Sequence, residues 1–184
     1  MKLAVIFPGI GYRMDRPLLY ESKKLAMKYG YGVLEVRYEG FPENIKGNRE
    51  KMMQAYQVAL EQTEQILEGV EFGQYENLLF ISKSIGTTVS AVYADKYHLH
   101  TNNVFYTPVA EFFQVVKQNN GIVFHGTQDP WVTTETVRLE CAKYGLPLYV
   151  TEGANHSLET GDTKKDAENL RIIMNRTEQY IKSC

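Results

Sequence analysis

The chain has 184 residues, of which 43% are hydrophobic and 23% charged, and its formal net charge is −2 at pH 7. This length suits one domain, residues 1–184, and this composition is typical of a folded globule rather than a disordered chain. Acidic and basic residues are nearly balanced, without a long run of either sign, so nucleic acid is not expected as a partner.

No window approaches the ~18 consecutive apolar residues of a membrane span, and the apolar start at residues 1–9 is too short for a signal peptide. We therefore expect a cytoplasmic protein that does not contact a membrane. The two cysteines, Cys141 and Cys184, show neither metal-ligand spacing nor a disulfide framework, which is typical of a reducing compartment. Neither a metal nor a cofactor is expected.

Short apolar segments alternate with segments of helical periodicity along the chain. Strands are expected at residues 2–7, 33–38, 78–81, 103–107, 122–126 and 146–151. Helices are expected at 17–29, about 48–67, after residue 84, at 133–144 and at the C-terminal end. This alternation predicts an α/β three-layer sandwich, in which a mostly parallel six-stranded sheet has helices on both faces.

The central motif is Ser82-Lys83-Ser84-Ile85-Gly86, which joins the third strand to a helix. Small residues two before and two after Ser84 allow a sharp strand-turn-helix corner that lifts its hydroxyl above the sheet. The alternative is that Ser84 is an ordinary helix N-cap. Lys83 beside it is unusual: its side chain either points away from the corner or favours an anionic substrate.

Two further polar residues follow strand ends, where ligands of open α/β sheets bind. Asp129 lies in His125-Gly126-Thr127-Gln128-Asp129, after the fifth strand, and His156 lies in Gly153-Ala154-Asn155-His156, after the sixth. Asp129 could instead be a turn residue before Pro130, and His156 a solvated loop histidine. His125 is expected to be a buried structural residue.

The order of serine, acid and histidine on three successive strand ends resembles the α/β-hydrolase superfamily, specifically its small cap-less members of the dienelactone-hydrolase kind. The resemblance covers the whole chain and also includes the Phe-Pro-Gly-Ile-Gly segment after the first strand. The chain departs from its relatives in having Pro8-Gly9 where they often have His-Gly. The two N-terminal antiparallel strands of larger relatives are also missing.

The resemblance implies that Ser84 is a nucleophile, His156 its general base and acid, and Asp129 the residue that orients His156. A backbone oxyanion hole would be formed by Ile85 with Ile10, or with Gly11 in place of Ile10. No lid is expected, because residues 108–120 are too few to form one. The open cleft would be lined by Tyr12, Phe112 and Trp131.

Three functions are compatible with these patterns. The first is hydrolysis of a small carboxylester, thioester or lactone through an acyl-enzyme. The second is a catalytically silent binding or scaffold protein of the same fold. The third, a dinucleotide-binding fold, is disfavoured because residue 14 is Met rather than glycine and the next helix begins only at Pro17. A homodimer could form if an edge strand, at 2–7 or 146–151, paired with its copy.

Overall fold

The computed structural model describes residues 1–45 and 47–184. Its strands are β1 (Lys2–Phe7), β2 (Tyr31–Glu35), β3 (Asn77–Lys83), β4 (Asn102–Tyr106), β5 (Ile122–Gly126) and β6 (Leu148–Thr151). Its α-helices are α1 (Pro17–Lys28), α2 (Arg49–Ile66), α3 (Ile85–Lys96), α4 (Thr134–Tyr144) and α5 (Thr163–Ser183). Two short 3-10 segments are η1 (Phe72–Gln74) and η2 (Ala110–Gln114).

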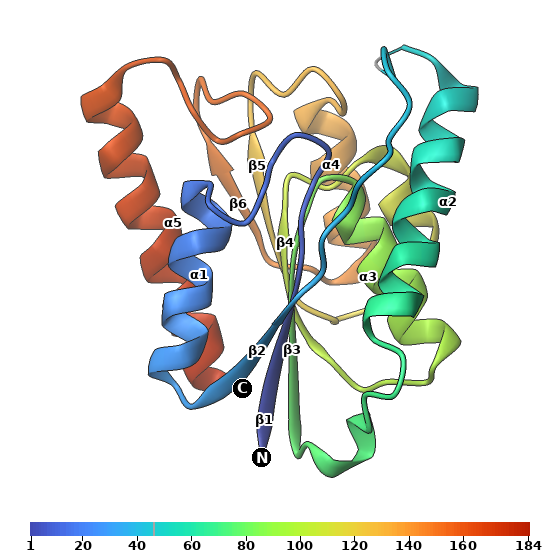
Figure 1. Ribbon diagram of the computed structural model, residues 1–184. Helices are drawn as coiled ribbons and strands as arrows, with labels where there is room; N and C mark the ends of the chain where they lie inside the picture. Colours follow the sequence, from blue (N-terminus) through green and yellow to red (C-terminus); the bar gives the residue numbers. More distant parts are fainter. Residues whose placement is uncertain (46) are drawn as a thin grey trace.

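The six strands form one sheet in the order β2-β1-β3-β4-β5-β6, and every neighbouring pair is parallel (Figure 1). The predicted fold class is therefore confirmed. The chain moves to one side of β1 to form β2 and to the other side to form β3, so the strand order reverses between β1 and β3. A reversal of this kind opens a crevice at the carboxyl ends of the two strands, which is where open α/β sheets bind ligands.

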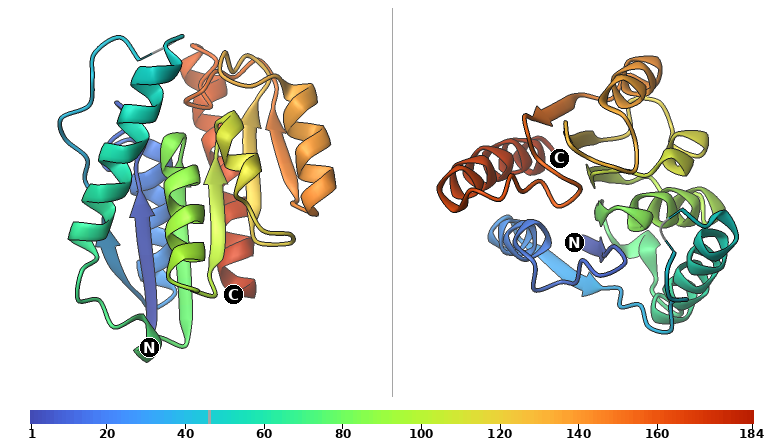
Figure 2. Two further views of the ribbon diagram at one scale, coloured as in Figure 1. Left: turned by 90° about the vertical axis from the view of Figure 1, so that its right-hand side faces the viewer. Right: turned by 90° about the horizontal axis from the view of Figure 1, so that it is seen from above.

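Helices cover both faces of the sheet. Alternate strand residues point to opposite faces: Leu79 and Ile81 pack with α1 and α5, whereas Leu78 and Phe80 pack with α2 and α3. α4 lies on the same face as α2 and α3, because its Val137 joins a cluster with strand residues of β4 and β5. Seen from above, α1 and α5 lie together on one side and the other three helices on the opposite side (Figure 2).

Two predicted strands are displaced in the structure. β2 begins at Tyr31 and ends at Glu35, because it pairs only with residues 2–6 of β1, its single neighbour. β6 begins at Leu148 instead of residue 146, since Pro147 has no N–H to donate to a ladder. The expectation that residues 2–7 form an edge is wrong, because β1 lies between β2 and β3. The edges are β2 and β6.

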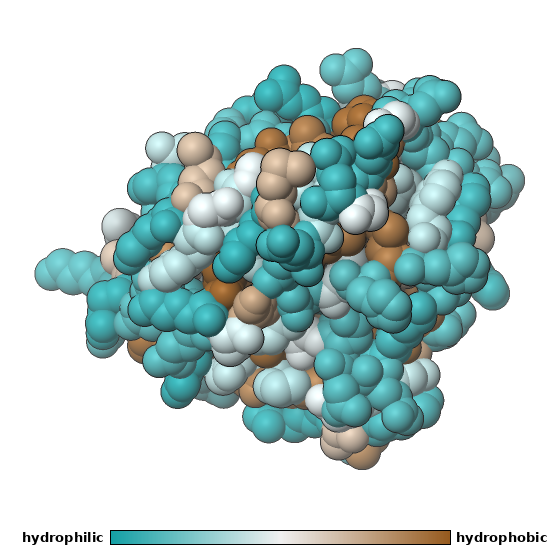
Figure 3. Space-filling model, turned by 90° about the horizontal axis from the view of Figure 1, so that it is seen from below, coloured by the Kyte–Doolittle hydropathy of each residue, from teal (hydrophilic) through white to brown (hydrophobic). Residues whose placement is uncertain are grey.

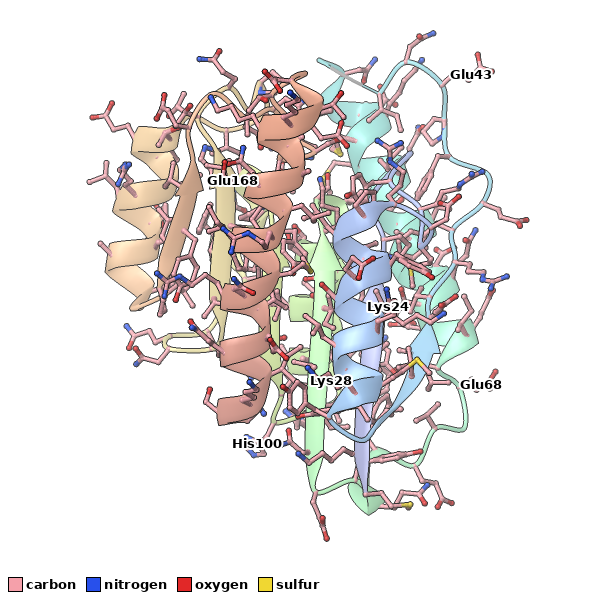
Figure 4. All side chains as sticks on the ribbon, turned by 90° about the vertical axis from the view of Figure 1, so that its left-hand side faces the viewer. Lys24, Lys28, Glu43, Glu68, His100 and Glu168 are labelled. Atoms are coloured by element: carbon pink, nitrogen blue, oxygen red, sulfur yellow. The ribbon has the colours of Figure 1, made fainter. Side chains whose placement is uncertain are left out.

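The end of the molecule at which the strands begin is covered mainly by hydrophilic side chains (Figure 3). The outer surfaces of α1 and α5 are joined by an ion pair between Lys28 and Glu178, 2.8 Å apart, and the two helices lie side by side in Figure 4. His100 lies at this lower end, far from the carboxyl edge of the sheet (Figure 4). Among the described residues, no helix combines the length and the apolar character needed to cross a membrane.

Candidate active site

The corner between β3 and α3 places Ser84 at the carboxyl edge of the sheet. Its backbone angles are φ 56° and ψ −125°, a conformation that residues with a side chain rarely adopt. Ser84 occupies the N-cap position of α3, but its side chain makes no capping hydrogen bond. The hydroxyl is therefore directed away from the helix, and the strained backbone is of the kind that recurs at functional sites.

Gly86 permits the close approach of α3 to the end of β1. A Cβ at this position would lie 2.5 Å from the Pro8 carbonyl oxygen and 2.6 Å from that of Phe7. Gly9 is also close, because a Cβ there would lie 3.0 Å from the Cβ of Ser84. The absence of side chains at these two glycines therefore brings the turn after β1 against the candidate nucleophile.

His156 lies between Ser84 and Asp129. Its Nε2 is 2.8 Å from Ser84 Oγ, and its Nδ1 is 2.7 Å from Asp129 Oδ2. The three residues come from the loops after β3, β5 and β6, which meet because parallel strands present their carboxyl ends at one edge. The side chain of Asp129 is fully buried and that of His156 is 19% exposed. The structure thus joins all three sequence-predicted residues in one continuous chain of hydrogen bonds.

Backbone contacts hold the acid and the histidine loop in place. Asp129 Oδ1 accepts a hydrogen bond of 2.9 Å from the backbone N–H of Trp131, so Asp129 is a turn residue as well as a partner of His156. Thr107 Oγ1 donates a 3.0 Å hydrogen bond to the backbone oxygen of His156. The sequence analysis missed Thr107, although it directly follows β4 and the rule that selected Asp129 and His156 could have found it. Its φ of 42° is exceptional for a β-branched residue.

His125 lies on the other side of Asp129. It is fully buried, as expected, and its Nε2 is 3.2 Å from Thr134 Oγ1. Its Nδ1 is 3.9 Å from Asp129 Oδ2 and has no hydrogen-bond partner among the described residues. Burial lowers the pKa of His125, so this ring is neutral near pH 7 and contributes no positive charge to the site.

Burial and hydrogen bonding set the charge states of the chain from Ser84 to Asp129. Burial lowers the pKa of His156; the hydrogen bond that its Nδ1 makes to the Asp129 carboxylate opposes this effect, and the charge of Lys83 adds to it. The imidazole is therefore neutral near pH 7, the form that can accept a proton. Burial alone would raise the pKa of Asp129. The hydrogen bond and charge of His156, together with the hydrogen bond from Trp131 N–H, outweigh burial, so the pKa of Asp129 is lowered. Asp129 is thus a carboxylate.

Lys83 is buried directly beside the candidate nucleophile, with only 1% of its surface exposed. Its side chain lies on the face of the sheet that α1 and α5 cover, and Nζ is 5.0 Å from the centre of the Tyr12 ring. Burial lowers its pKa to about 7, although the negative charges of Asp129 and Glu159 act in the opposite direction. The side chain thus points into the protein, and it does not offer an exposed charge to a substrate.

Backbone N–H groups are available for an oxyanion close to Ser84. Ile85 follows the serine as the first residue of α3, where N–H groups have no partner within the helix. Gly9 and Tyr12 exchange hydrogen bonds of 3.2 and 3.4 Å, so Ile10 and Gly11 form the tip of a tight turn. Ile10 directly follows Gly9, where an added Cβ would lie 3.0 Å from the Cβ of Ser84. We therefore retain Ile10 as the preferred second donor, with Gly11 as the alternative.

Comparisons with known proteins bear on the fold of the chain. No model of a protein family matches the chain, and no curated protein matches it. Solved structures do match. An α/β serine hydrolase homologue from Coxiella burnetii has a TM-score of 0.68 and 16% identity, over 97% of this chain and 84% of that chain. An esterase from Pyrococcus furiosus has a TM-score of 0.68 and 13% identity, over 99% and 82%.

A third match is a serine hydrolase without a lid from Xanthomonas campestris, with a TM-score of 0.66 and 12% identity, over 98% of this chain and 81% of that chain. The chain has the α/β-hydrolase fold. At these identities the likeness concerns the fold alone. Its sheet contains six strands in the part of the chain that the structure describes.

The α/β-hydrolase fold places the three expected substrate-binding residues differently. Trp131 is half-buried beside the histidine, with ring centres 5.8 Å apart, so it remains a candidate wall of the site. Phe112 is fully buried against Phe105, and its prediction as a pocket residue is wrong because it belongs to the core. Tyr12 is also buried, and its hydroxyl accepts a 3.1 Å hydrogen bond from Leu18 N–H. It lies beneath the site and supports Lys83 rather than a substrate.

The glycine turn after β1 does not form a phosphate-binding helix terminus. Helix α1 begins at Pro17, and its N-cap Arg16 makes no capping hydrogen bond with its side chain. Among the described residues, no group of three or more His, Cys, Asp or Glu side chains could hold a metal ion.

Proposed function

We propose that this protein is a serine hydrolase that cleaves an ester-type bond of a small substrate, such as a carboxylester, a thioester or a lactone. The observation that carries the proposal is the pair of contacts made by His156, at 2.8 Å from Ser84 Oγ and 2.7 Å from Asp129 Oδ2. Solved structures of the same fold include proteins described as serine hydrolases and esterases, which supports the same activity.

In the proposed reaction, Ser84 Oγ attacks the substrate carbonyl carbon while its proton passes to His156 Nε2. Asp129 holds the imidazole in the tautomer that leaves Nε2 free, and it stabilises the imidazolium that forms. The carbonyl oxygen becomes an oxyanion, which the backbone N–H groups of Ile85 and Ile10 stabilise.

Collapse of this first intermediate breaks the bond to the leaving group, which takes the proton from His156. The acyl group then remains on Ser84. Water attacks the acyl-enzyme, giving its proton to His156, and the second collapse returns that proton to Ser84 and releases the carboxylic acid. No cofactor is consumed in either half of the reaction.

The test is labelling by a fluorophosphonate probe together with turnover of p-nitrophenyl butyrate. Wild-type protein should react in both assays, and Ser84→Ala should lose labelling and most of its turnover, by about 10³-fold or more. Ser157→Ala is the matched control, because Ser157 is next to His156 in sequence and its hydroxyl makes no hydrogen bond to that ring in the described structure. Unlabelled wild-type protein would favour the alternative of a silent binding or scaffold protein.

A further inference from the structure

An apolar groove of about 180 Å³ opens beside the first turn of α3. One wall is formed by Met52 and Tyr56 of α2, and the opposite wall includes Val109 and Val115, which flank η2. Ile85 and Thr88 of α3 and Met53 of α2 also line it, and the exposed Glu111 and Gln114 of η2 lie at its edge. In the view from above, α3 lies between α2 and η2, at the end of the molecule where the strands end (Figure 2).

The groove and the proposed oxyanion hole share Ile85. Its backbone N–H is the first donor of the hole, and its side chain lines the groove. Ile10, the preferred second donor, packs on the same small cluster as Ile85 and Met52. A carbonyl group bound between Ser84 and the Ile85 N–H would therefore have its acyl carbon next to the entrance of the groove.

The chemistry of the walls suits a hydrocarbon chain. Met52 and Tyr56 present a thioether and an aromatic ring, and a methionine side chain adapts to occupants of different shape. The larger cavity at the site, about 440 Å³ on the side of β2, is lined by Arg13, Asp15, Arg37 and Glu39 together with apolar residues. An apolar chain would leave those four charged groups less hydrated. The smaller groove has one charged residue, the exposed Glu111, so it is the better place for an apolar chain.

We propose that this groove binds the acyl group of the substrate, and that this group is an apolar chain or ring of about six carbons. The inference rests on the proposed function. The size follows from the volume, since an apolar cavity of about 150 Å³ in another protein holds a benzene molecule.

The first experiment compares p-nitrophenyl acetate, butyrate, hexanoate and decanoate. The ratio kcat/KM should rise about fourfold for each CH₂ from acetate to hexanoate, which corresponds to about 0.8 kcal/mol per buried CH₂. It should stop rising at decanoate, when the groove is full. Acetate esters of alcohols of increasing length should show no such rise. A rise with the alcohol and none with the acyl chain would place the leaving group in the groove and overturn the proposal.

The second experiment fills the groove. Met52→Trp should lower the ratio of hexanoate to acetate turnover at least tenfold, because the indole would occupy the space beside Ile85. Gln65→Trp is the matched control, since it adds the same side chain at an exposed position of the same helix. If Met52→Trp does not fold, Met53→Trp at the half-exposed rim replaces it. An unchanged ratio in a folded variant would overturn the proposal.

Thr88 offers a third variant, because its buried hydroxyl has no hydrogen-bond partner among the described residues. Thr88→Val keeps the shape of the groove and removes this polar atom, so the hexanoate-to-acetate ratio should rise. A fall would mean that the groove binds a polar group and would overturn the proposal.

Fluorophosphonate labelling of the wild type and of every variant separates the two proposals. If the wild type is not labelled, the hydrolase function is refuted. If it is labelled but kcat/KM does not change with acyl-chain length, only the proposed role of the groove is refuted.

Discussion

The ammonium group of Lys83 lies 5.0 Å from the centre of the Tyr12 ring, and Arg16 Cζ lies 5.5 Å from the same centre. Arg16 also forms an ion pair of 3.4 Å with Glu159, whereas Lys83 forms no ion pair within the described residues. The aromatic ring can stabilise a cation, yet the buried amine has lost its hydration. Lys83 is thus a titratable group directly beneath the candidate active site.

We expect Lys83 to set the acid limb of the pH profile of kcat/KM. Below about pH 7 it is protonated, and its positive charge lowers the pKa of His156. Lys83→Met should therefore raise the pKa of His156 and move the acid limb to higher pH, so that activity at pH 5.5 falls by several-fold relative to its own plateau. The measurement is kcat/KM of p-nitrophenyl butyrate from pH 5 to 8.

Lys83→Arg is the control for this profile, because a guanidinium keeps the positive charge. The negative groups that face Lys83 are Asp129 and Glu159, and both remain in each variant. The acid limb of Lys83→Arg should stay at or below the wild-type pH. If the limb of Lys83→Met does not move, the lysine has no electrostatic influence on His156.

Lys83 should also make the stability of the fold depend on pH. Its pKa is about 7 in the folded protein and 10.5 in the unfolded chain. Between these values the unfolded state binds a proton that the folded state lacks, so the free energy of unfolding rises with pH, by up to about 1.4 kcal/mol per pH unit. Urea unfolding of wild type and Lys83→Met from pH 7 to 9.5 should show this rise in the wild type alone. Parallel curves would contradict the lowered pKa.

Replacing the acid should impair chemistry more than folding. Asp129→Asn cannot stabilise an imidazolium at His156, and its amide can favour the wrong tautomer of the ring, so kcat should fall by about 10⁴-fold. The Asx-type contact from Trp131 N–H to the side chain can survive, because an asparagine keeps one oxygen. The thermal unfolding midpoint, measured by circular dichroism, should therefore change far less than the activity. Wild-type activity in Asp129→Asn would exclude Asp129 from the mechanism.

Gly86 should tolerate no side chain. Gly86→Ala would place a Cβ 2.5 Å from the Pro8 oxygen, which is backbone and cannot rotate away. The resulting shift should cost about 1–3 kcal/mol of stability and displace the Gly9 turn from Ser84. Gly73→Ala is the matched control, since no atom lies within 4 Å of its Cβ position. Urea unfolding of the two variants measures the difference, and equal stabilities would contradict the close approach.

The carboxyl-edge residues show what the sequence determined by itself. Each of the three residues Ser84, Asp129 and His156 follows an apolar run that predicts a strand. Parallel strands bring the residues that follow them to one edge of the sheet, so the sequence pattern was enough to predict that these three lie together. The same rule selects Thr107, which was overlooked. Chain order also indicated the parallel sheet, because four of the five connections between successive strands contain a predicted helix.

Only the tertiary structure decided matters that depend on neighbours distant in sequence. In the observed strand order β1 lies between β2 and β3, inside the sheet. No local sequence pattern encodes which strands become the neighbours of β1. An aromatic residue that follows a strand, such as Phe112, can line a pocket or belong to the core. Packing against Phe105 places Phe112 in the core. The Lys83 side chain is buried, and the Tyr12 ring that lies 5.0 Å from its Nζ comes from a turn distant in sequence. Burial depends on contacts between separate segments, so residue type and spacing alone cannot determine it.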